Sequence, residues 1–212
     1  MNTDMTSHRR FISIEGGEGA GKSTVISALA EALRARGEPV VQSREPGGTA
    51  LAEKIRELLL DPDHEPATVH TELLLMFAAR SQHVAQRIAP ALASGAWVLC
   101  DRFTDSSYAY QGAGRGVSPT LIETLEREVV GIQPALTFLL DLDVAAGRAR
   151  TRLRGGAPDR IEREQDAFFQ RVREGFLARA RSQPARFCVL DASRSAAEVA
   201  AAAVAALEAY QA

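Results

Sequence analysis

The sequence predicts an α/β fold in which one parallel sheet of five strands is covered by helices on both faces. Five short apolar runs alternate with longer segments whose apolar residues recur at helical spacing. This alternation is typical of parallel strands joined by crossover helices. A glycine-rich loop lies between the first apolar run and the first helix. With 212 residues, the chain is expected to form a single domain spanning residues 1–212.

The first strand and helix flank the most informative stretch. Residues 11–14 indicate a buried strand, and residues 25–33 carry Val25, Leu29 and Leu33 at helical spacing. Residues 16–23 match the phosphate-loop pattern G-x-x-x-x-G-K-S/T at every fixed position. Glycines let successive N–H groups converge on an anion, and the new helix adds its positive dipole end. The stretch therefore predicts a P-loop NTPase fold and a nucleotide site.

Two side chains of this loop have predicted roles. Lys22 should reach the β- and γ-phosphates of ATP, and the Ser23 hydroxyl should ligate Mg²⁺. Lysine is scarce in this chain, since Lys22 and Lys54 are its only two, yet one stands where the loop needs it. The residues expected to bind ATP are Gly16, Gly17, Glu18, Gly19, Ala20, Gly21, Lys22, Ser23 and Thr24.

The middle of the chain continues the alternation. Residues 38–42 indicate a second strand, and Thr49 should cap a helix over residues 50–60. A loop over residues 61–66 precedes a long helix, roughly residues 69–93, whose end Pro90 should break or kink. Residues 96–100 form the third predicted strand.

The last third follows the same pattern. Pro119 should begin a helix reaching Val130, and strands are expected at residues 136–140 and 187–190. Further helices are predicted over residues 144–153 and 161–180, with a hinge-like loop over residues 154–160. The run from Ser195 to Glu198 is a capping box that opens the last helix.

Charged residues follow several predicted strands. Ligands of parallel sheets bind outside the carboxyl ends of the strands, so these charges should gather where chemistry occurs. The residues concerned are Glu15, Arg44, Asp101, Arg102, Asp143 and Asp191.

The composition and charge of the chain argue against several classes of function and location. The formal net charge of −2 gives no basic footprint for nucleic acid. Cys100 and Cys188 lie in apolar runs and are expected to be buried thiols in a reducing compartment. Residues 1–8 are expected to be disordered, and residues 1–10 lack the apolar core of a signal peptide. The alanine-rich end is too short and polar to span a bilayer. The expectation is a cytoplasmic protein that binds neither nucleic acid nor membranes.

Three classes of phosphate-loop protein compete. A guanine-specific switch needs an N-K-x-D motif, but Asn2 is the only asparagine. In a motor ATPase a second acid would follow Asp101, where this chain has Arg102. A kinase for a small anionic acceptor needs a second anion site, and Arg44, Arg80 and Arg102 are candidates for it. A kinase is therefore the favoured class.

The residues then resemble a known family, the bacterial thymidylate kinases, from the strand before the phosphate loop nearly to the C-terminus. The R-E-P-G-G-T and D-R…A-Y-Q-G segments are highly specific in combination. The motifs that carry the resemblance are residues 14–23, residues 44–49, residues 75–80, residues 101–102 with 106–112, residues 114–116 and residues 159–162.

This resemblance implies transfer of the γ-phosphoryl group of ATP to dTMP, giving dTDP for dTTP synthesis, with Mg²⁺ as cofactor. Phe77 would stack on thymine, and Arg44 and Arg102 would hold the dTMP phosphate as planar forks. Mg²⁺ would lie at Ser23, with Asp101 binding it through water. The implied substrate-binding residues are Glu18, Arg44, Phe77, Arg80, Arg102, Ser107, Tyr108 and Gln111.

One departure within the family concerns catalysis. Some thymidylate kinases carry an arginine inside the phosphate loop, where this chain has Gly19 and Ala20. The chain resembles the type that supplies this arginine from a lid, here roughly residues 148–162. Arg154 is the first candidate, followed by Arg150 and Arg152, with Arg160 assisting; Lys22 and Arg102 complete the expected catalytic set.

Two alternatives stay open at this stage. A related kinase could act on another deoxynucleoside monophosphate, because details of the pocket set the choice of base. A more distant alternative is a nucleotide-binding regulator without transfer activity. The resemblance also implies a homodimer.

Overall fold

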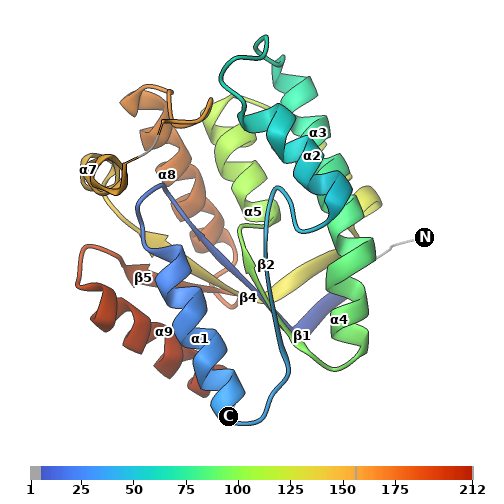
Figure 1. Ribbon diagram of the computed structural model, residues 1–212, viewed down its shortest axis with the longest axis vertical. Helices are drawn as coiled ribbons and strands as arrows, with labels where there is room; N and C mark the ends of the chain where they lie inside the picture. Colours follow the sequence, from blue (N-terminus) through green and yellow to red (C-terminus); the bar gives the residue numbers. More distant parts are fainter. Residues whose placement is uncertain (1–5, 156, 212) are drawn as a thin grey trace.

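The computed structural model describes residues 6–155 and 157–211, without the side chains of residues 6, 7 and 154. Within this part, five parallel strands form one sheet in the order β2-β3-β1-β4-β5, which confirms the predicted fold class. Figure 1 shows the sheet with helices on both sides. The strands are β1 (Thr6–Gly16), β2 (Val40–Arg44), β3 (Trp97–Asp101), β4 (Ile132–Asp141) and β5 (Phe187–Asp191).

The described helices include three π-helical segments, labelled η. They are α1 (Lys22–Ala35), α2 (Ala50–Leu60), α3 (Val69–His83), η1 (Val84–Ile88), α4 (Ala89–Ala93), α5 (Thr104–Ser107), η2 (Tyr108–Gly114), α6 (Pro119–Leu125), η3 (Glu126–Val130), α7 (Val144–Arg154), α8 (Asp166–Ser182) and α9 (Ala196–Gln211).

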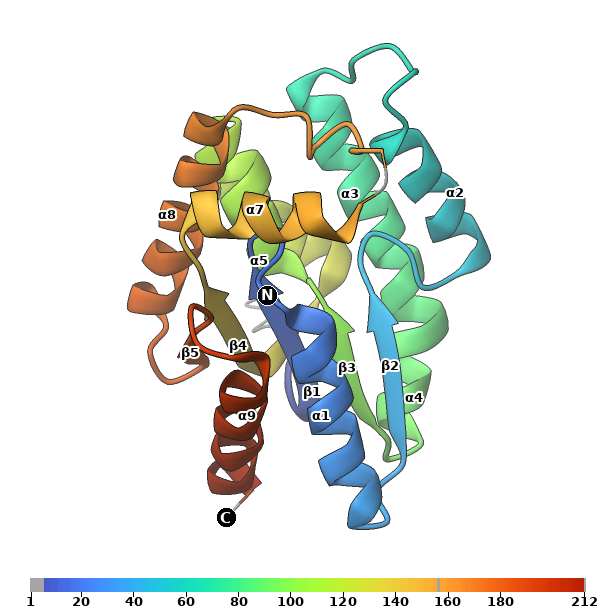
Figure 2. The same cartoon turned by 60° about the vertical axis from the view of Figure 1, so that its left-hand side comes forward.

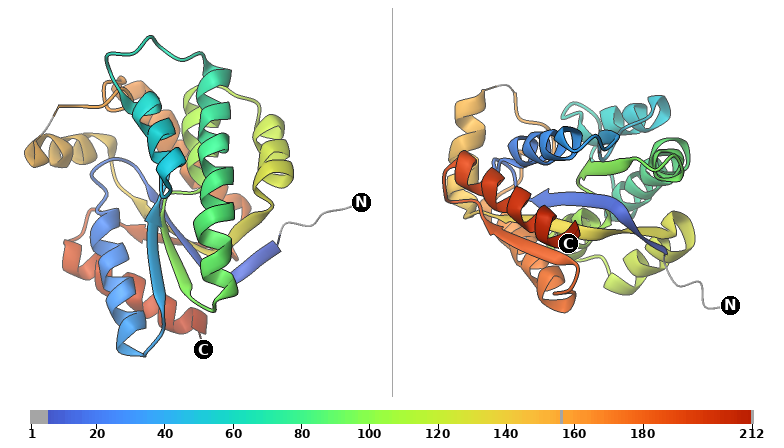
Figure 3. Two further views of the ribbon diagram at one scale, coloured as in Figure 1. Left: turned by 45° about the vertical axis from the view of Figure 1, so that its right-hand side comes forward. Right: turned by 90° about the horizontal axis from the view of Figure 1, so that it is seen from below.

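Alternating side chains of the strands separate the core into two faces. Ile12 and Ile14 of β1 pack against α1 and α9, whereas Phe11 packs against α3 on the other face. This follows from the two-residue period of a strand, which sends neighbouring side chains to opposite sides. A view from below shows α1 (blue) and α9 (red) together on one side of the sheet (Figure 3, right). Both faces of the central strands are therefore apolar, as the sequence indicates.

The N-terminal strand is longer than predicted. β1 begins at Thr6, and His8 pairs with Pro134 of β4 before a register shift that ends at Ile12. The expected disorder of residues 1–8 thus does not extend to residues 6–8, and residues 1–5 lie outside the described residues.

The long predicted helix over residues 69–93 is helical throughout but changes its winding. The π-helical segment η1 separates α3 from α4, in which Pro90 lies. Proline lacks an N–H group and clashes with the carbonyl of the preceding turn, and a widened turn nearby is one way to absorb it.

The helix predicted from Ile161 begins five residues late, at Asp166. The Asp159 carboxylate accepts hydrogen bonds from the backbone N–H groups of Ile161 and Glu162, at 2.9 and 2.8 Å. This turn competes with helix formation. In addition, the Arg160 N–H bonds the Leu60 carbonyl oxygen at 3.0 Å, which ties the segment to the end of α2.

Helix α7 and the segment after it occupy the predicted lid region. Figure 2 shows α7 lying crosswise above the carboxyl ends of the strands. Among the described helices, none combines the length and apolar character needed to cross a bilayer.

Candidate active site

The phosphate loop joins β1 to α1 as predicted, and glycine is required at two of its turns. Gly21 caps α1 with φ +92°, and Gly19 has φ +72°. A Cβ atom on Gly19 would collide with the Gly147 carbonyl oxygen of α7, so the lid helix touches the loop directly. The Lys22 ammonium donates to the carbonyl oxygens of Gly16 and Gly17 at 3.3 and 3.1 Å, which folds it back over the loop.

A cavity of about 570 Å³ opens beside the loop, at the carboxyl ends of β1, β2 and β3. Lys22 and Ser23 line one side, and side chains of β2, α3 and η2 line the other. Asp143 and Asp191 are not among the lining residues: Asp143 caps α7, and Asp191 bonds Ser193 near α9. Only some of the charged residues at the carboxyl ends of the strands therefore lie at this cavity.

Arginine side chains gather in this cavity. Arg44 and Arg102 line it as predicted, and so does Arg56, which the sequence analysis missed. The signal for Arg56 was its spacing from Ala52 and Leu59, which places all three on the inner side of α2. Arg44 is held by Glu53 at 3.0 Å, and Arg56 donates to the Pro46 carbonyl oxygen at 2.9 Å.

Arg102 is held between the two sides of the cavity. Its guanidinium donates to the Gly16 carbonyl oxygen at 3.0 Å and to Glu18 Oε1 at 2.7 Å. Its backbone has φ +69°, a left-handed conformation that non-glycine residues rarely adopt. Neighbouring bonds enforce it: the Arg102 N–H bonds the Ile14 carbonyl oxygen at 2.9 Å, and the Phe103 N–H bonds Glu15 Oε1 at 2.7 Å.

Glu15 lies fully buried beneath this turn. Besides the Phe103 N–H, it accepts a hydrogen bond from the Ser106 hydroxyl at 2.6 Å. Burial, together with the nearby Asp105 carboxylate, raises the pKa of Glu15 to about 8. The folded protein therefore favours a protonated Glu15 at neutral pH.

The chemistry for a divalent cation is present at Asp101 and Ser23. Both line the cavity, and Asp101 Oδ1 is a buried oxygen to which none of the described residues donates a hydrogen bond. Hydroxyl and carboxylate oxygens are ligands that Mg²⁺ favours. An unpaired buried carboxylate oxygen is costly, so a cation or its water would complete this environment. These residues therefore fit the predicted ion.

Arg80 of α3 is fixed by three polar neighbours. It donates to Glu45 Oε2 at 2.6 Å, to the Ser107 hydroxyl at 3.0 Å and to the Phe103 carbonyl oxygen at 3.2 Å. Arg80 and Ser107, which the resemblance implies as substrate-binding residues, both line the cavity.

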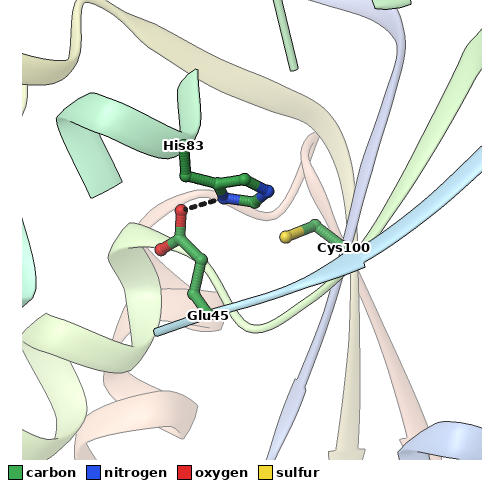
Figure 4. Close-up of side chains that lie close together, drawn as sticks. All are labelled: Glu45, His83 and Cys100. Atoms are coloured by element: carbon green, nitrogen blue, oxygen red, sulfur yellow. Dashed lines mark hydrogen bonds and ion pairs between the residues drawn. The ribbon is translucent and has the colours of Figure 1, made fainter. Parts of the chain in front are cut away.

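His83 contacts Glu45, the carboxylate that holds Arg80 (Figure 4). His83 Nδ1 lies 2.9 Å from Glu45 Oε1, and its Nε2 lies 2.6 Å from the Ser43 hydroxyl. Figure 4 also places the Cys100 thiol beside the ring. Both ring nitrogens have partners, and burial raises the pKa of the Cys100 thiol well above its usual range. The cluster is therefore a hydrogen-bonded support for Glu45.

Phe77 does not line the cavity, contrary to the prediction that it stacks on thymine. It is 1% exposed, packs in the core with Phe11 and Phe103, and is absent from the residues that line the cavity. The Arg80 guanidinium covers its ring at 4.8 Å. Met76, interpreted from sequence as core filling, lines the cavity instead. Helical spacing could not decide which of two adjacent apolar residues faces a ligand.

Of the two tyrosines in η2, the one that lines the cavity is not the one that was predicted. Tyr108 bonds Glu126 at 2.8 Å and faces a different groove, whereas Tyr110 lines the cavity and lies 3.3 Å from Glu18 Oε1. The π-helical winding of η2 alters the rotation per residue, so a regular helix pattern could not place these rings. Gln111, an implied substrate-binding residue, lines the cavity. Ser106 lines it as well, although only its place in the family motif, and no role in the site, was expected from sequence.

The lid arginines take different positions. Arg150 lines the cavity and donates to the Ala192 carbonyl oxygen at 3.0 Å. Arg152 is exposed and is not among the lining residues. Arg160 bonds Glu72 and the Leu59 carbonyl oxygen, both at 2.7 Å, and so anchors the segment. Arg154, the first candidate, has its side chain outside the described residues.

Fold and site together define a phosphate-loop protein in which a second, arginine-lined anion site faces the loop, which is the arrangement of a nucleotide kinase. The sequence signature of the family described as thymidylate kinase matches residues 14–203. The chain belongs to the thymidylate kinase family.

Individual relatives agree with this assignment. The chain is 60% identical to a thymidylate kinase of Chromohalobacter salexigens over 88% of this chain and 89% of that one. It is 58% identical to one of Pseudomonas entomophila over 89% and 90%. The crystal structure of thymidylate kinase from Ehrlichia chaffeensis matches with a TM-score of 0.76 and 34% identity, covering 95% of this chain and 98% of that one.

Phe77→Ala should lower the free energy of unfolding by about 3–5 kcal/mol, because a fully buried ring leaves a cavity. Met76→Ala should cost less, since its side chain borders a space that already exists. Urea denaturation of both variants measures the two losses. A smaller loss for Phe77→Ala than for Met76→Ala would contradict the core placement of Phe77.

Glu15→Gln should change how stability depends on pH. The folded pKa of about 8 lies above the ordinary glutamate value, so Glu15 contributes stability at low pH that is lost as pH rises through 8. Relative to Glu15→Gln, the wild-type protein should therefore lose about 2–3 kcal/mol between about pH 6 and pH 8.5. Urea denaturation across this range measures the difference, and a constant difference would exclude a raised pKa.

Proposed function

We propose that the protein transfers the γ-phosphoryl group of ATP to dTMP, giving dTDP, with Mg²⁺ as cofactor. The observation that carries the proposal is one cavity with two facing anion sites. Lys22 and the phosphate loop form the first, and Arg44, Arg56 and Arg102 form the second. Membership of the thymidylate kinase family supports this choice of reaction.

The donor site is proposed at the phosphate loop. The loop N–H groups and Lys22 would hold the phosphates, and Ser23 and Asp101 would hold Mg²⁺, directly or through water. A second cavity of about 360 Å³ adjoins the loop between Thr24, Arg150 and Arg194, with room for the nucleoside of ATP. Bound Mg²⁺ would neutralise charge on the transferring group.

The acceptor site is proposed on the opposite wall. The forks of Arg44 and Arg102, assisted by Arg56, would hold the dTMP phosphate. The sugar 3′-hydroxyl would lie near Glu18 and Tyr110. Arg80, Ser107 and Gln111 would surround the base, and Met76 replaces Phe77 as the apolar contact. Tyr108 would not contact dTMP, because it faces another groove.

The reaction needs no strong general base, because a phosphate oxygen of dTMP is already anionic. Catalysis then consists of alignment and charge neutralisation. Lys22 of α1, Arg102 after β3 and Arg150 of α7 line the same cavity, so they would lie around the transferring group. Helix α7 above the loop would exclude water and so limit hydrolysis of ATP.

A homodimer is proposed as the assembly. Leu51 and Leu58 of α2 and Leu74 of α3 are more than half exposed, at 55%, 53% and 57%. The two helices pack side by side, so these residues offer an apolar face for a second copy of the chain.

A coupled assay with dTMP, dUMP, dCMP and dGMP in parallel tests the function. The proposal expects dTMP to give the highest kcat/KM. A higher kcat/KM for another monophosphate would mean that this compound, and not dTMP, is the substrate. ATP binding without any phosphoryl transfer would favour a nucleotide-binding regulator.

Lys22→Ala should reduce turnover of dTMP by at least about a thousandfold, because the transferring phosphoryl group loses its ammonium partner. Lys54→Ala is the matched control: it removes the other lysine, whose exposed ammonium pairs with Glu57. Comparable rates for both variants in the coupled assay would show that phosphoryl transfer does not require the Lys22 ammonium.

Arg150→Ala should lower kcat by roughly tenfold or more, whereas Arg152→Ala should leave kcat within about twofold, because only Arg150 faces the cavity. The two residues lie two positions apart on the same helix, so changes in helix propensity cancel. Steady-state kinetics with both substrates measure the split. A larger decrease in kcat for Arg152→Ala would assign the catalytic role to Arg152 instead of Arg150.

A further inference from the structure

Glu72, in the first turn of α3, is a buried acid with no role in the site described so far. It is 1% exposed and links α3 to two other segments, η2 with its C-terminal cap and the segment that contains Arg160. Its Oε1 accepts from Gln111 Nε2 at 2.8 Å and from Arg115 Nε at 3.0 Å, and its Oε2 accepts from Arg160 Nη2 at 2.7 Å.

The charge of Glu72 determines which edge of the Gln111 amide it contacts. Burial opposes ionisation, but hydrogen bonds from Gln111, Arg115 and Arg160 outweigh it and hold the pKa of Glu72 below its usual value. An ionised carboxylate can only accept hydrogen bonds. The amide group beside it must therefore be the NH₂ group of Gln111, and the orientation with the carbonyl toward Glu72 is excluded.

This orientation fixes what Gln111 can offer a ligand. Gln111 lines the acceptor cavity, and within the described part of the chain no donor reaches its Oε1 atom. The free edge of the amide is thus a hydrogen-bond acceptor. Arg80, also in the cavity wall, is a donor only and is held in place by Glu45 and Ser107.

The wall therefore combines a fixed donor with a fixed acceptor. Thymine and uracil carry a carbonyl oxygen next to a ring N–H, which matches this pair. Cytosine carries an amino group next to an unprotonated ring nitrogen, which reverses both polarities and would leave buried groups unpaired.

We propose that Glu72 is a positioning residue that sets base specificity, by locking the Gln111 amide with its carbonyl toward the acceptor base. This inference rests on the proposed function. Glu72 itself touches no substrate. Its effect is to keep the Gln111 part of the discrimination against an amino-substituted base. An unrestrained amide would lose that part after a flip, and only the donor-only Arg80 would still oppose the amino group.

Glu72→Gln is the first test. The new amide can donate as well as accept, so Gln111 can turn over. The ratio of kcat/KM for dTMP to that for dCMP should fall by about 10-fold to 100-fold, and the ratio of the two dissociation constants from calorimetry should fall with it. Unchanged ratios in the folded variant would overturn the inference.

Glu72→Asp is the second test and keeps the negative charge for Arg115 and Arg160. It withdraws the carboxylate from Gln111 by one methylene, so discrimination should again fall. Glu164→Gln is the matched control: it removes the other carboxylate partner of Arg115, 2.6 Å away, but leaves the Gln111 contact intact. The control should keep the wild-type ratio.

The outcomes separate this inference from the function on which it rests. Failure of the wild-type protein to phosphorylate dTMP would overturn the proposed function. Wild-type turnover of dTMP combined with full discrimination in either folded Glu72 variant would overturn the role of Glu72 alone. Equal loss in Glu164→Gln would assign the effect to the Arg115 ion pair.

Discussion

Mutual repulsion among cations is the constraint on which the site depends. Several guanidinium groups and one ammonium face a single cavity, and they must keep their positions before any anion arrives. Carboxylates provide the counter-charge: Glu18 holds Arg102, Glu45 holds Arg80, and Glu53 holds Arg44. All three arginines line the cavity while they are paired in this way. A phosphate that enters therefore meets donors that are already oriented, and little entropy is lost in gathering them.

The carboxylates tie these forks to the scaffold. Glu45 follows β2 and is supported by His83 of α3, whereas Glu18 lies in the phosphate loop itself. The acceptor wall is thus connected to the central sheet through buried polar groups. Such networks are stable only when every member has its partner, which makes their geometry well defined. This arrangement suits a kinase, because such an enzyme must hold its reacting groups in a defined geometry.

Much of the fold was predictable from sequence, because the strands and helices depend on local patterns of apolar residues and on glycine and proline. The phosphate loop is local as well, so Lys22 and Ser23 could be placed at the cavity from sequence, and their roles there stay predictions. Phe77, Met76, Tyr108 and Tyr110 were different. Their facing depends on the winding of α3 and η2, and a single residue of rotation exchanges core for cavity. Glu72 could not be found because its partners are distant in sequence and meet only after folding.

The contact between Gly19 and Gly147 has one further consequence. A Cβ atom on either residue would overlap the other segment's backbone, so helix α7 rests on the phosphate loop with no side chain between them. The lid helix α7 is therefore in direct backbone contact with the phosphate loop beside the cavity. A methyl group on either glycine would therefore push α7 away from the loop, so the close seating of this helix requires glycine at both positions.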